Sequence, residues 1–270
     1  MDYIAINKAL WNARTELHID SAFYDMDSFV KGQNSLKEIE LALLGDVSGK
    51  SILHLQCHFG QDSLSLARMG AEVTAVDFSD KAIETATKLS EELAIPATFI
   101  CCNLYDLPQH LDKKFDYVFT SYGTIGWLPD IDKWASLVSR FLKTNGKFIF
   151  AEFHPVVWMF DDNFDYVAYN YSNSDPIVET ISGSYADRNG AMQQQSVGWN
   201  HGLAEVISAL LKNGLSIESF REYDYSPYNC LPGLEEVEPG KFRVKKLGNN
   251  IPMVYSLTAV IKTPADEHKQ

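Results

Sequence analysis

The sequence predicts an α/β fold in which helices cover both faces of a doubly wound, parallel β-sheet. Short runs rich in β-branched and aromatic residues alternate with amphipathic helical patterns between residues 51 and 152. Capping residues, glycines and a proline mark the ends of these helical patterns. Parallel strands need long crossover connections, and this alternation supplies them. Ligands in such sheets bind beyond the carboxyl ends of the strands.

The elements follow one another in a regular order along this part of the chain. Strands are expected at residues 51–55, 71–76, 97–101, 115–120 and 147–152. Helices are expected at residues 61–69, 80–93 and 131–142. Ser79 is the expected N-cap of the second helix, and Gly70, Pro96 and Gly146 follow the expected helix ends.

The composition is typical of a globular chain whose partner is a small molecule. Its 270 residues, 46% hydrophobic and 22% charged, can bury a full core. Its 36 acidic and 23 basic residues give a net charge of -13, which opposes binding to a nucleic-acid backbone. Without a signal-peptide pattern or a run of about 20 apolar residues, neither export nor a membrane partner is expected. Four cysteines without C-x-x-C spacing predict reduced thiols in a cytoplasm, with no disulfide framework and no metal site.

The turn after the first expected strand reads "LQCHFGQ" and carries most of the functional information. Nucleotide-binding turns use glycine where the backbone is left-handed or approaches the ligand closely, and only Gly60 remains here. The dinucleotide fingerprint G-x-G-x-x-G is absent, which disfavours hydride transfer with NAD. Asp77 follows the second strand, and its carboxylate can accept both hydroxyl hydrogens of a ribose. Phe78 offers a flat ring to an adenine.

Residues 52–79 resemble motif I and its sequel in class I S-adenosylmethionine-dependent methyltransferases, which commonly read V-L-D-L-G-C-G-x-G. Gln56 and His58 stand at the first two glycines of that pattern, and Cys57 between them matches. Gly60 matches the last glycine, and Asp77 matches the ribose-binding acid. The resemblance implies S-adenosylmethionine as cofactor and S-adenosylhomocysteine as product.

His54 stands where this family has its acidic residue. A neutral imidazole can accept one hydrogen bond but offers no full charge to the ammonium group of the cofactor, and the Gln56 carbonyl oxygen could contribute. Two other interpretations stay open. His54 and His58 could simply fill the loop, or they could join Cys57 in a metal site, which their close spacing disfavours.

The resemblance extends over residues 50 to 155. In "CCNLYDLP", Asn103 occupies the adenine-amino contact of the family and Leu104 the residue that frames the adenine. "SYGTIGWLPD", which begins at Ser121 and Tyr122, resembles the loop that floors the methionine part of the cofactor. "TNGKFIFAEFHP" resembles the turn and fifth strand of the family.

A C-terminal helix at residues 199–212 and strands within 215–225 and 253–262 agree with this resemblance. In the family, a last helix and two strands form the antiparallel edge of a seven-stranded sheet. The resemblance therefore implies a Rossmann-like methyltransferase fold: a doubly wound, mostly parallel sheet of seven strands with an antiparallel edge and an added β-rich insertion.

Four regions are expected along the chain. They are an N-terminal helical lid segment (1–49), a cofactor-binding α/β core (50–155), a β-rich insertion on the substrate side (156–198), and the last helix and edge strands of the same core (199–263). A D-R-N-G sequence predicts a hairpin turn in the insertion. A capping box from Ser35 to Glu38 predicts a helix that ends at Gly45.

The N-terminal segment of small-molecule methyltransferases often folds over the cofactor. By that analogy Trp11, Asn12, His18 and Tyr24 are candidate lid contacts, although a packed helix is the simpler interpretation.

Methyl transfer asks mainly for an in-line approach of the acceptor and exclusion of water. A base is needed only if the acceptor must first lose a proton, and the candidates are Glu152, His154 and His201. Tyr122 could orient the acceptor or contact the sulfonium. The alternative is that His154 turns the chain and that residues 199–201 cap a helix.

These observations predict methyl transfer from S-adenosylmethionine to a small-molecule acceptor. The replaced loop residues leave open a noncatalytic protein that binds the cofactor or a metabolite. An NAD-dependent oxidoreductase fits less well, because the glycines are missing. The acceptor atom and the oligomeric state stay open at the level of sequence.

Overall fold

The computed structural model describes residues 1–172, 175–248 and 250–262. The chain forms two compact units, each assembled from separate stretches of sequence. The first unit comprises residues 1–36, 44–120 and 177–197, and the second comprises residues 37–43, 121–176 and 198–270. Residue 263, the expected end of the last region, and residues 173–174 of the expected insertion lie outside the described residues.

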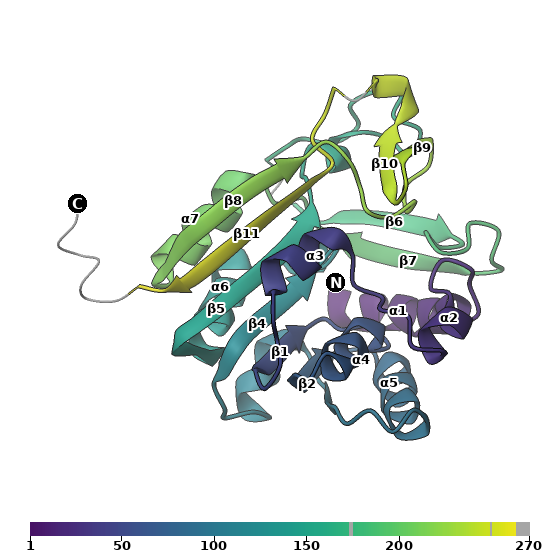
Figure 1. Cartoon of the computed structure of the whole chain (residues 1–270). Coiled ribbons are helices and arrows are strands. Elements are labelled where there is room, and N and C mark those ends of the chain that lie inside the picture. Colours follow the sequence, from purple (N-terminus) through teal and green to yellow (C-terminus); the bar gives the residue numbers. More distant parts are fainter. Residues whose placement is uncertain (173–174, 249, 263–270) are drawn as a thin grey trace. The chain divides into compact units, whose positions relative to one another are not determined.

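Seven strands form one sheet in the order β3-β2-β1-β4-β5-β11-β8, as Figure 1 shows for most of them. The first unit supplies β1 (Ser51–Leu55), β2 (Glu72–Asp77), β3 (Thr98–Cys101) and nearly all of β4 (Phe115–Ser121). Within this unit, the pairs β1–β2, β1–β4 and β2–β3 are parallel. All five residues of β1 are buried, as expected for a central parallel strand that is covered on both faces.

The second unit supplies β5 (Leu142–Phe153), β8 (Leu215–Tyr223) and β11 (Val254–Ile261). Strand β11 runs antiparallel to both β5 and β8, which confirms the antiparallel edge that the resemblance implied. Strands β9 (Leu234–Glu238) and β10 (Lys241–Val244) form a separate antiparallel pair. In the first unit, β6 (Ile177–Ser182) and β7 (Gln193–Gly198) form another two-stranded sheet, so the added β-structure is present.

The helices of the first unit are fixed largely by their N-caps. Helix α1 (Tyr3–Ile19) begins where the Asp2 carboxylate accepts the Ala5 N–H, and α5 (Asp80–Glu92) where the Ser79 hydroxyl accepts the Ala82 N–H. Helix α2 (Met26–Val30) is short. Helix α4 (Gln61–Arg68) follows Gly60, and the 3₁₀ helix η1 (Leu104–Gln109) follows Asn103.

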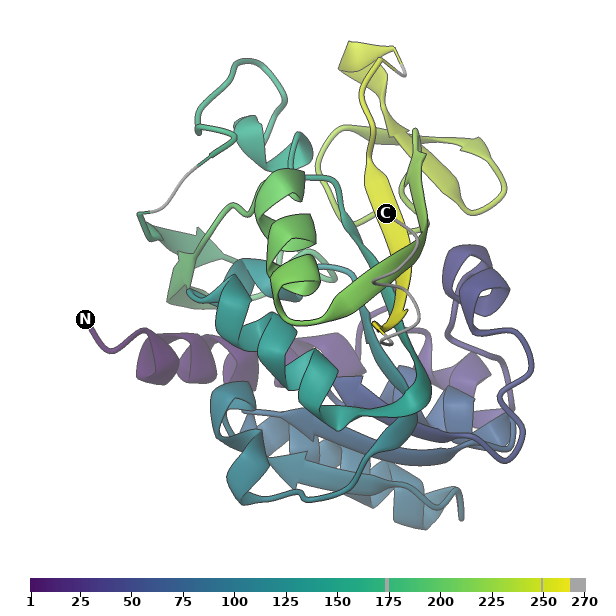
Figure 2. The same cartoon turned by 90° about the vertical axis from the view of Figure 1, so that its left-hand side faces the viewer.

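The second unit contains α6 (Ile131–Phe141) and α7 (Leu203–Lys212), which lie side by side in Figure 2. Trp134 of α6 packs on Phe148 and Phe150 of β5, at ring-centroid distances of 5.6 and 5.4 Å. Helix α3 (Glu38–Leu44) and three 3₁₀ turns complete the helical elements: η2 (Ile125–Trp127), η3 (Val157–Met159) and η4 (Lys245–Leu247).

Two sequence expectations about element ends are wrong. Strand β5 begins at Leu142, so Gly146 lies within the strand and does not end a helix. Helix α7 begins at Leu203 and not at residue 199, because Gly202 is extended and the Trp199 N–H binds the Gly126 carbonyl. The D-R-N-G sequence does form a turn, in which the Gly190 N–H donates to the Asp187 carbonyl at 3.3 Å; the turn lies within a longer loop between β6 and β7 that the Gly183 N–H closes on the Met192 carbonyl.

The expected capping box at Ser35 is also wrong. The Ser35 hydroxyl instead donates to the Asp62 carboxylate at 2.6 Å. The Glu40 carboxylate accepts the Lys37 N–H at 3.0 Å, so the side chain that reaches back to the start of α3 comes two residues later than expected.

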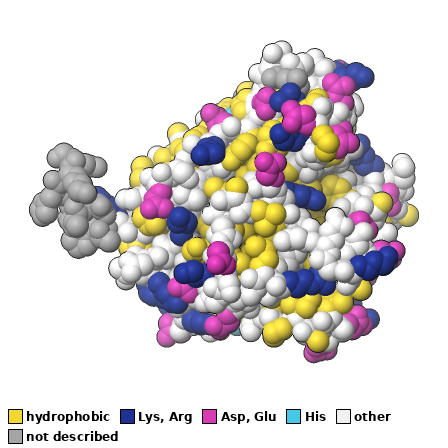
Figure 3. Space-filling model, viewed as in Figure 1, with side chains coloured by type: hydrophobic (Ala, Val, Ile, Leu, Met, Phe, Trp, Pro, Cys, Tyr) yellow, Lys and Arg dark blue, Asp and Glu magenta, His cyan; other side chains and the backbone are white. Residues whose placement is uncertain are grey.

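The surface carries charges of both signs. Figure 3 shows Lys and Arg side chains mixed with Asp and Glu over the face that it draws. Among the described residues, no helix has the length and apolar character needed to cross a bilayer.

Candidate functional site

The loop between β1 and α4 keeps a left-handed backbone at all three positions where the motif has glycine. The φ angles are +54° at Gln56, +52° at His58 and +78° at Gly60. A non-glycine residue in this region costs roughly 1–2 kcal/mol because its Cβ crowds the following carbonyl. The loop therefore retains the backbone shape of the glycine-rich motif with side chains added at two positions.

Gly60 is required for packing as well as for its backbone angle. A Cβ at this position would lie 2.8 Å from the Ala86 Cβ on α5 and 2.8 Å from the Phe99 ring on β3. Both neighbours belong to the first unit, and contacts this short would force them to move. The glycine is thus explained by the protein's own interior, and its predicted contact with a cofactor stays a prediction.

Asp77 ends β2 next to this loop. One oxygen of its buried carboxylate accepts the His58 N–H at 2.8 Å, and the other accepts the Ser79 N–H at 2.9 Å. Burial raises the pKa of Asp77 to about 6, and the hydrogen bonds from the backbone oppose this rise. Because a carboxylate oxygen accepts about two hydrogen bonds, each oxygen keeps capacity for a hydroxyl group.

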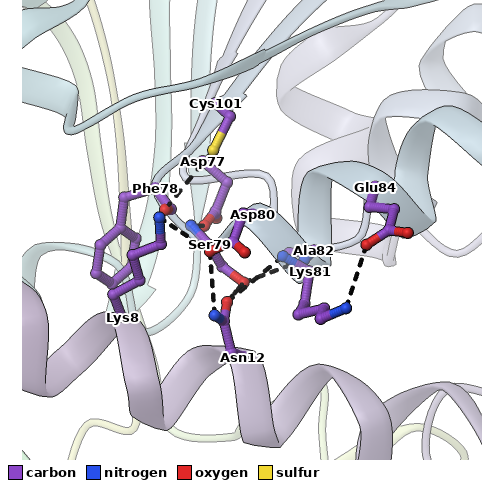
Figure 4. Close-up of polar contacts among 10 residues, drawn as sticks. All are labelled: Lys8, Asn12, Asp77, Phe78, Ser79, Asp80, Lys81, Ala82, Glu84 and Cys101. Atoms are coloured by element: carbon purple, nitrogen blue, oxygen red, sulfur yellow. Dashed lines mark hydrogen bonds and ion pairs between the residues drawn. The ribbon is translucent and has the colours of Figure 1, made fainter.

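Helix α1 lies along the turn that follows Asp77 (Figure 4). The Asn12 amide accepts the Ser79 hydroxyl at 2.6 Å and donates to the Asp80 carboxylate at 3.1 Å. The Lys8 ammonium lies 2.9 Å from the same Asp80 carboxylate, and their hydrogen bond lowers the pKa of Asp80 to about 2. The N-terminal helix is therefore held directly at the carboxyl end of β2.

Two imidazoles, those of His18 and His58, lie beside this turn, and four side chains pack around them. We call these six residues the histidine cluster: Trp11, Arg14, His18, Tyr24, His58 and Tyr185. His18 Nδ1 and His58 Nε2 lie 2.8 Å apart. The Trp11 ring lies 5.1 Å from His58, and Tyr24 stacks on His18 at 5.2 Å. The Tyr24 and Tyr185 hydroxyls share a 2.6 Å hydrogen bond.

Within this cluster, the Arg14 guanidinium lies 4.9 Å from the Trp11 ring centre and 5.7 Å from that of Tyr185. Burial lowers the pKa of His18 to about 3, and the charge of Arg14 adds to this effect. Burial also holds the pKa of His58 well below its usual value, and His18 and Arg14 act in the same direction. Both imidazoles are therefore neutral near pH 7.

His54 is a buried residue of β1. Its Nδ1 is 2.8 Å from the Ser63 hydroxyl, and its ring centre is 4.9 Å from that of Phe119. Burial lowers the pKa of His54 to about 3, so this imidazole is neutral as well. Burial raises the pKa of the neighbouring Cys57 thiol well above its usual value, which keeps the thiol protonated.

Asn103 and Leu104 follow β3 in the same unit. The Asn103 side-chain oxygen accepts the Tyr105 N–H at 3.1 Å and so caps η1, while Leu104 is buried. The Cys102 N–H donates to the Asp77 carbonyl at 3.1 Å, which fixes this turn beside the end of β2. Asn103 is thus held near the residues that the sequence assigned to the ribose and adenine.

In the second unit, Glu152 holds the loop that follows β4. Its buried carboxylate accepts five hydrogen bonds, from the backbone N–H groups of Gly123, Thr124, Ile125 and Phe153 and from the Thr124 hydroxyl. Burial raises the pKa of Glu152, and the backbone donors oppose that rise. The carboxylate therefore acts first as an anchor for this loop.

Ser121 and Tyr122 begin the same loop. Tyr122 has a φ of +43°, and its hydroxyl donates to the fully buried Glu40 carboxylate at 2.7 Å. Burial and the charge of Glu40 raise the pKa of Tyr122 well above its usual value. With its hydrogen committed to Glu40, the Tyr122 oxygen can offer only lone pairs to another group.

His154 and His201 are buried in the second unit with both ring nitrogens in contact. His154 Nδ1 accepts the Val156 N–H at 3.2 Å, and its Nε2 lies 2.8 Å from the Glu222 carboxylate. His201 Nε2 lies 2.7 Å from the Leu128 carbonyl, and its Nδ1 lies 3.0 Å from the Glu205 carboxylate. Each ring is fixed by partners on two sides.

The structure gathers part of the expected site in the first unit. The members of that group are Trp11, Tyr24, His54, Gln56, Cys57, Gly60, Asp77, Phe78, Asn103 and Leu104. Ser121, Tyr122, Glu152, His154 and His201 belong to the second unit. In the residues that the structure describes, no three His, Cys, Asp or Glu side chains group closely enough to hold a metal ion.

Sequence reasoning missed Arg14, Tyr185 and Glu40. Trp11, Arg14 and His18 are spaced three and four residues apart, which places them on one face of α1 and could have revealed Arg14. Nothing in the sequence points to Tyr185 or Glu40, because each reaches its partner from a stretch at least 80 residues away in sequence.

Comparison with known proteins agrees with this geometry. Residues 52–146 match a family model described as a methyltransferase domain. The chain is 27% identical over 145 residues to a ubiquinone biosynthesis O-methyltransferase of Chromobacterium violaceum, covering 50% of this chain and 62% of that protein. The chain therefore spans less than two thirds of this relative.

Two solved structures are similar over most of the chain. One is a putative S-adenosylmethionine-dependent methyltransferase from Listeria monocytogenes, with a TM-score of 0.55, 20% identity, and coverage of 83% of this chain and 98% of that one. The other is an S-adenosylmethionine-dependent methyltransferase from Clostridium acetobutylicum, with a TM-score of 0.58, 15% identity, and coverage of 96% and 100%. At 15–20% identity these likenesses show the fold, which is the Rossmann-like α/β fold of methyltransferases.

Proposed function

We propose that this protein transfers a methyl group from S-adenosylmethionine to a small-molecule acceptor. One observation carries the proposal: Gln56, His58 and Gly60 keep the left-handed backbone of a methyltransferase motif, and this shape aims the His58 N–H at the Asp77 carboxylate. The match of residues 52–146 to a methyltransferase domain supports the same assignment. Left-handed non-glycine residues are strained and cluster at functional sites, so the strain at Gln56 and His58 favours a functional role for this loop.

The residues of the first unit fit this cofactor. The Asp77 oxygens keep acceptor capacity for two ribose hydroxyl groups. Phe78 follows β2, Asn103 and Leu104 come after β3, and we assign these three residues to the adenine. His18 Nε2 and His58 Nδ1 are buried and have no hydrogen-bond partner among the described residues. Such atoms suit a polar ligand group, because leaving them unpaired costs about 1–3 kcal/mol each.

When bound, S-adenosylmethionine supplies a methyl group that a cationic sulfonium has already made electrophilic. The protein then has to hold the ribose at Asp77, cover the site with α1, and keep water away from the acceptor. We assign cofactor contacts to Trp11, Tyr24, His54, Gln56, Cys57, Gly60 and Ser121 on the basis of the resemblance. The regions 1–49 and 156–198 serve in this proposal as lid and substrate-side insertion.

The second unit favours positioning over proton transfer. Glu152 is engaged with five donors, and both nitrogens of His154 and His201 face fixed partners. Of the four residues predicted to be catalytic, Tyr122 is best suited to orient an acceptor, because its oxygen offers lone pairs to a hydroxyl or amine hydrogen. Glu152, His154 and His201 act in this proposal by fixing the surrounding chain.

The acceptor is proposed to be a small organic molecule. The net charge of -13 opposes nucleic acid, and a relative carries the name of an enzyme that methylates oxygen in ubiquinone biosynthesis. The four cysteines, Cys57, Cys101, Cys102 and Cys230, are free thiols, which supports a reducing compartment such as the cytoplasm.

Calorimetry with S-adenosylhomocysteine, S-adenosylmethionine and NAD tests the cofactor. We expect the first two to bind and NAD not to bind; binding of NAD alone would contradict the proposal. A screen of phenols, amines, thiols and activated carbon acids for release of S-adenosylhomocysteine then tests transfer. Cofactor binding without turnover on any acceptor class would favour a noncatalytic binding protein.

A further inference from the structure

The two imidazoles of the histidine cluster form a hydrogen-bonded pair. His18 Nδ1 and His58 Nε2 share one hydrogen bond, with the rings nearly perpendicular at 89° and their centres 5.0 Å apart. Tyr24, Tyr185 and Trp11 hold the pair in place through ring contacts of 4.7 to 5.2 Å. The outer nitrogens, His18 Nε2 and His58 Nδ1, are buried without a partner among the described residues.

The chemistry of a neutral pair fixes what its outer atoms offer. A neutral imidazole has one N–H and one lone pair. If His18 Nδ1 donates the shared bond, His18 Nε2 has the lone pair and His58 Nδ1 has the hydrogen. If His58 Nε2 donates, the two outer roles are exchanged. In either tautomer, the pair presents one donor and one acceptor at its outer ends.

The rest of the loop lacks the usual group for a charged ligand end. His54 stands where the family has an acid and is neutral, and its Nδ1 is hydrogen-bonded to the Ser63 hydroxyl within the first unit. Arg14 adds a positive charge beside the histidine pair, through its place against Trp11 and Tyr185. The backbone N–H of His58 donates to the Asp77 carboxylate, so the histidine pair adjoins the carboxylate that we assign to the ribose.

We propose that the His18–His58 pair binds the amino-acid end of the cofactor, its outer N–H donating to the carboxylate and its outer lone pair accepting from the ammonium group. This inference rests on the proposed function. An ammonium–carboxylate group needs one acceptor and one donor, which is the set that the pair presents. Either tautomer satisfies it, because each presents one outer donor and one outer acceptor.

Two ligands separate this role from a merely structural one. S-adenosylhomocysteine carries the amino-acid end, whereas 5′-methylthioadenosine has the same adenosine thioether without it. Calorimetry should show that His18→Phe weakens S-adenosylhomocysteine about tenfold or more, the effect of losing one hydrogen bond to a charged group. Binding of 5′-methylthioadenosine should stay within about twofold, because its contacts lie at Asp77 and the adenine residues.

His110→Phe is the matched control, because His110 is exposed and has no part in the cluster. It should leave both affinities unchanged. Equal losses for the two ligands in His18→Phe, or no loss for either, would overturn the role of the pair while leaving the proposed function intact. If neither ligand binds the unaltered protein, the proposed function fails, and this inference fails with it.

Nitrogen NMR of the unaltered protein gives a second readout that does not depend on a variant folding. With ¹⁵N-labelled histidine, the ring shifts of His18 and His58 should move to a single tautomer on adding S-adenosylhomocysteine. They should move far less with 5′-methylthioadenosine. Identical shifts with the two ligands would contradict the proposal.

Discussion

Asp77 links the structural features of the loop to the proposed chemistry. Its carboxylate accepts two backbone N–H groups, yet burial outweighs them and raises its pKa to about 6. The carboxylate that would bind ribose is therefore ionised near neutral pH and protonated in mild acid. A protonated carboxyl loses acceptor sites, so cofactor affinity should depend on pH in this range.

We expect S-adenosylhomocysteine to bind about tenfold more weakly at pH 5 than at pH 7.5, because a pKa of about 6 leaves roughly a tenth of Asp77 ionised at the lower pH. Isothermal titration calorimetry across this range measures the change. Asp77→Asn is the control and should show weak binding without this pH dependence. A flat profile in the unaltered protein would show that the ionised carboxylate does not contact the ligand.

Replacing Asp77 by alanine removes the carboxylate altogether. Binding of S-adenosylhomocysteine should weaken by about 1.5–3 kcal/mol, the usual contribution of hydrogen bonds to a charged group. The measurement requires a check by circular dichroism that the variant is folded, since Asp77 also fixes the His58 and Ser79 N–H groups. An unchanged dissociation constant in a folded variant argues against ribose binding at this residue.

At the scale of elements, the β1–α4 loop holds a glycine-like shape without most of its glycines. Gln56 and His58 have φ angles near +50°, where L-residues are strained. The resemblance places these two residues where the family has glycine, and their positive φ angles are ones that glycine adopts readily. The shape follows from the strand, the helix and the Asp77 contact on either side, which the sequence pattern does encode.

The strain at Gln56 can be measured with two variants that both remove the polar side chain. Gln56→Gly should be more stable to urea than Gln56→Ala by roughly 0.5–1 kcal/mol, because relief of the left-handed strain exceeds the added chain entropy of glycine. The two variants differ by one methyl group, so the lost contacts of the glutamine amide cancel in the comparison. An alanine variant as stable as the glycine variant would mean that the loop is not left-handed at residue 56.

The loop after β4 depends on Glu152. In Glu152→Gln, one carboxylate oxygen becomes an NH₂ group that cannot accept a backbone N–H, so the free energy of unfolding should fall by about 1–3 kcal/mol. Urea unfolding measures this loss. Glu218→Gln, on the exposed part of β8, should change stability by less than about 0.5 kcal/mol. Full stability of Glu152→Gln would be inconsistent with the anchoring role.

The boundaries that sequence reasoning missed have physical causes at this same scale. Gly146 lies inside β5, which begins at Leu142 and pairs with β11 from Lys147 to Phe153. Residues 199–202 were expected to begin the last helix. The Trp199 backbone N–H donates to the Gly126 carbonyl, however, and the helix begins at Leu203. Ser35 prefers Asp62 as a partner. In each case a contact distant in sequence outweighed a local signal.

For the whole molecule, the sheet topology was largely predictable, because each parallel strand and crossover helix has its own local pattern. The five strands between residues 51 and 153 and the antiparallel edge are confirmed. The site was less predictable. The His18–His58 contact, the Tyr24–Tyr185 bond and the Glu40–Tyr122 bond each join stretches at least 40 residues apart, and no local pattern specifies such pairs.

The central claim is that the adenosine of the cofactor lies at the carboxyl ends of β1 and β2, with its ribose held by Asp77. A crystal structure of the complex with S-adenosylhomocysteine tests it most directly. Both ribose hydroxyl oxygens should lie within about 3 Å of the Asp77 carboxylate, the usual length of such a hydrogen bond. Side chains of the protein filling that position, or a ligand bound elsewhere, would contradict it.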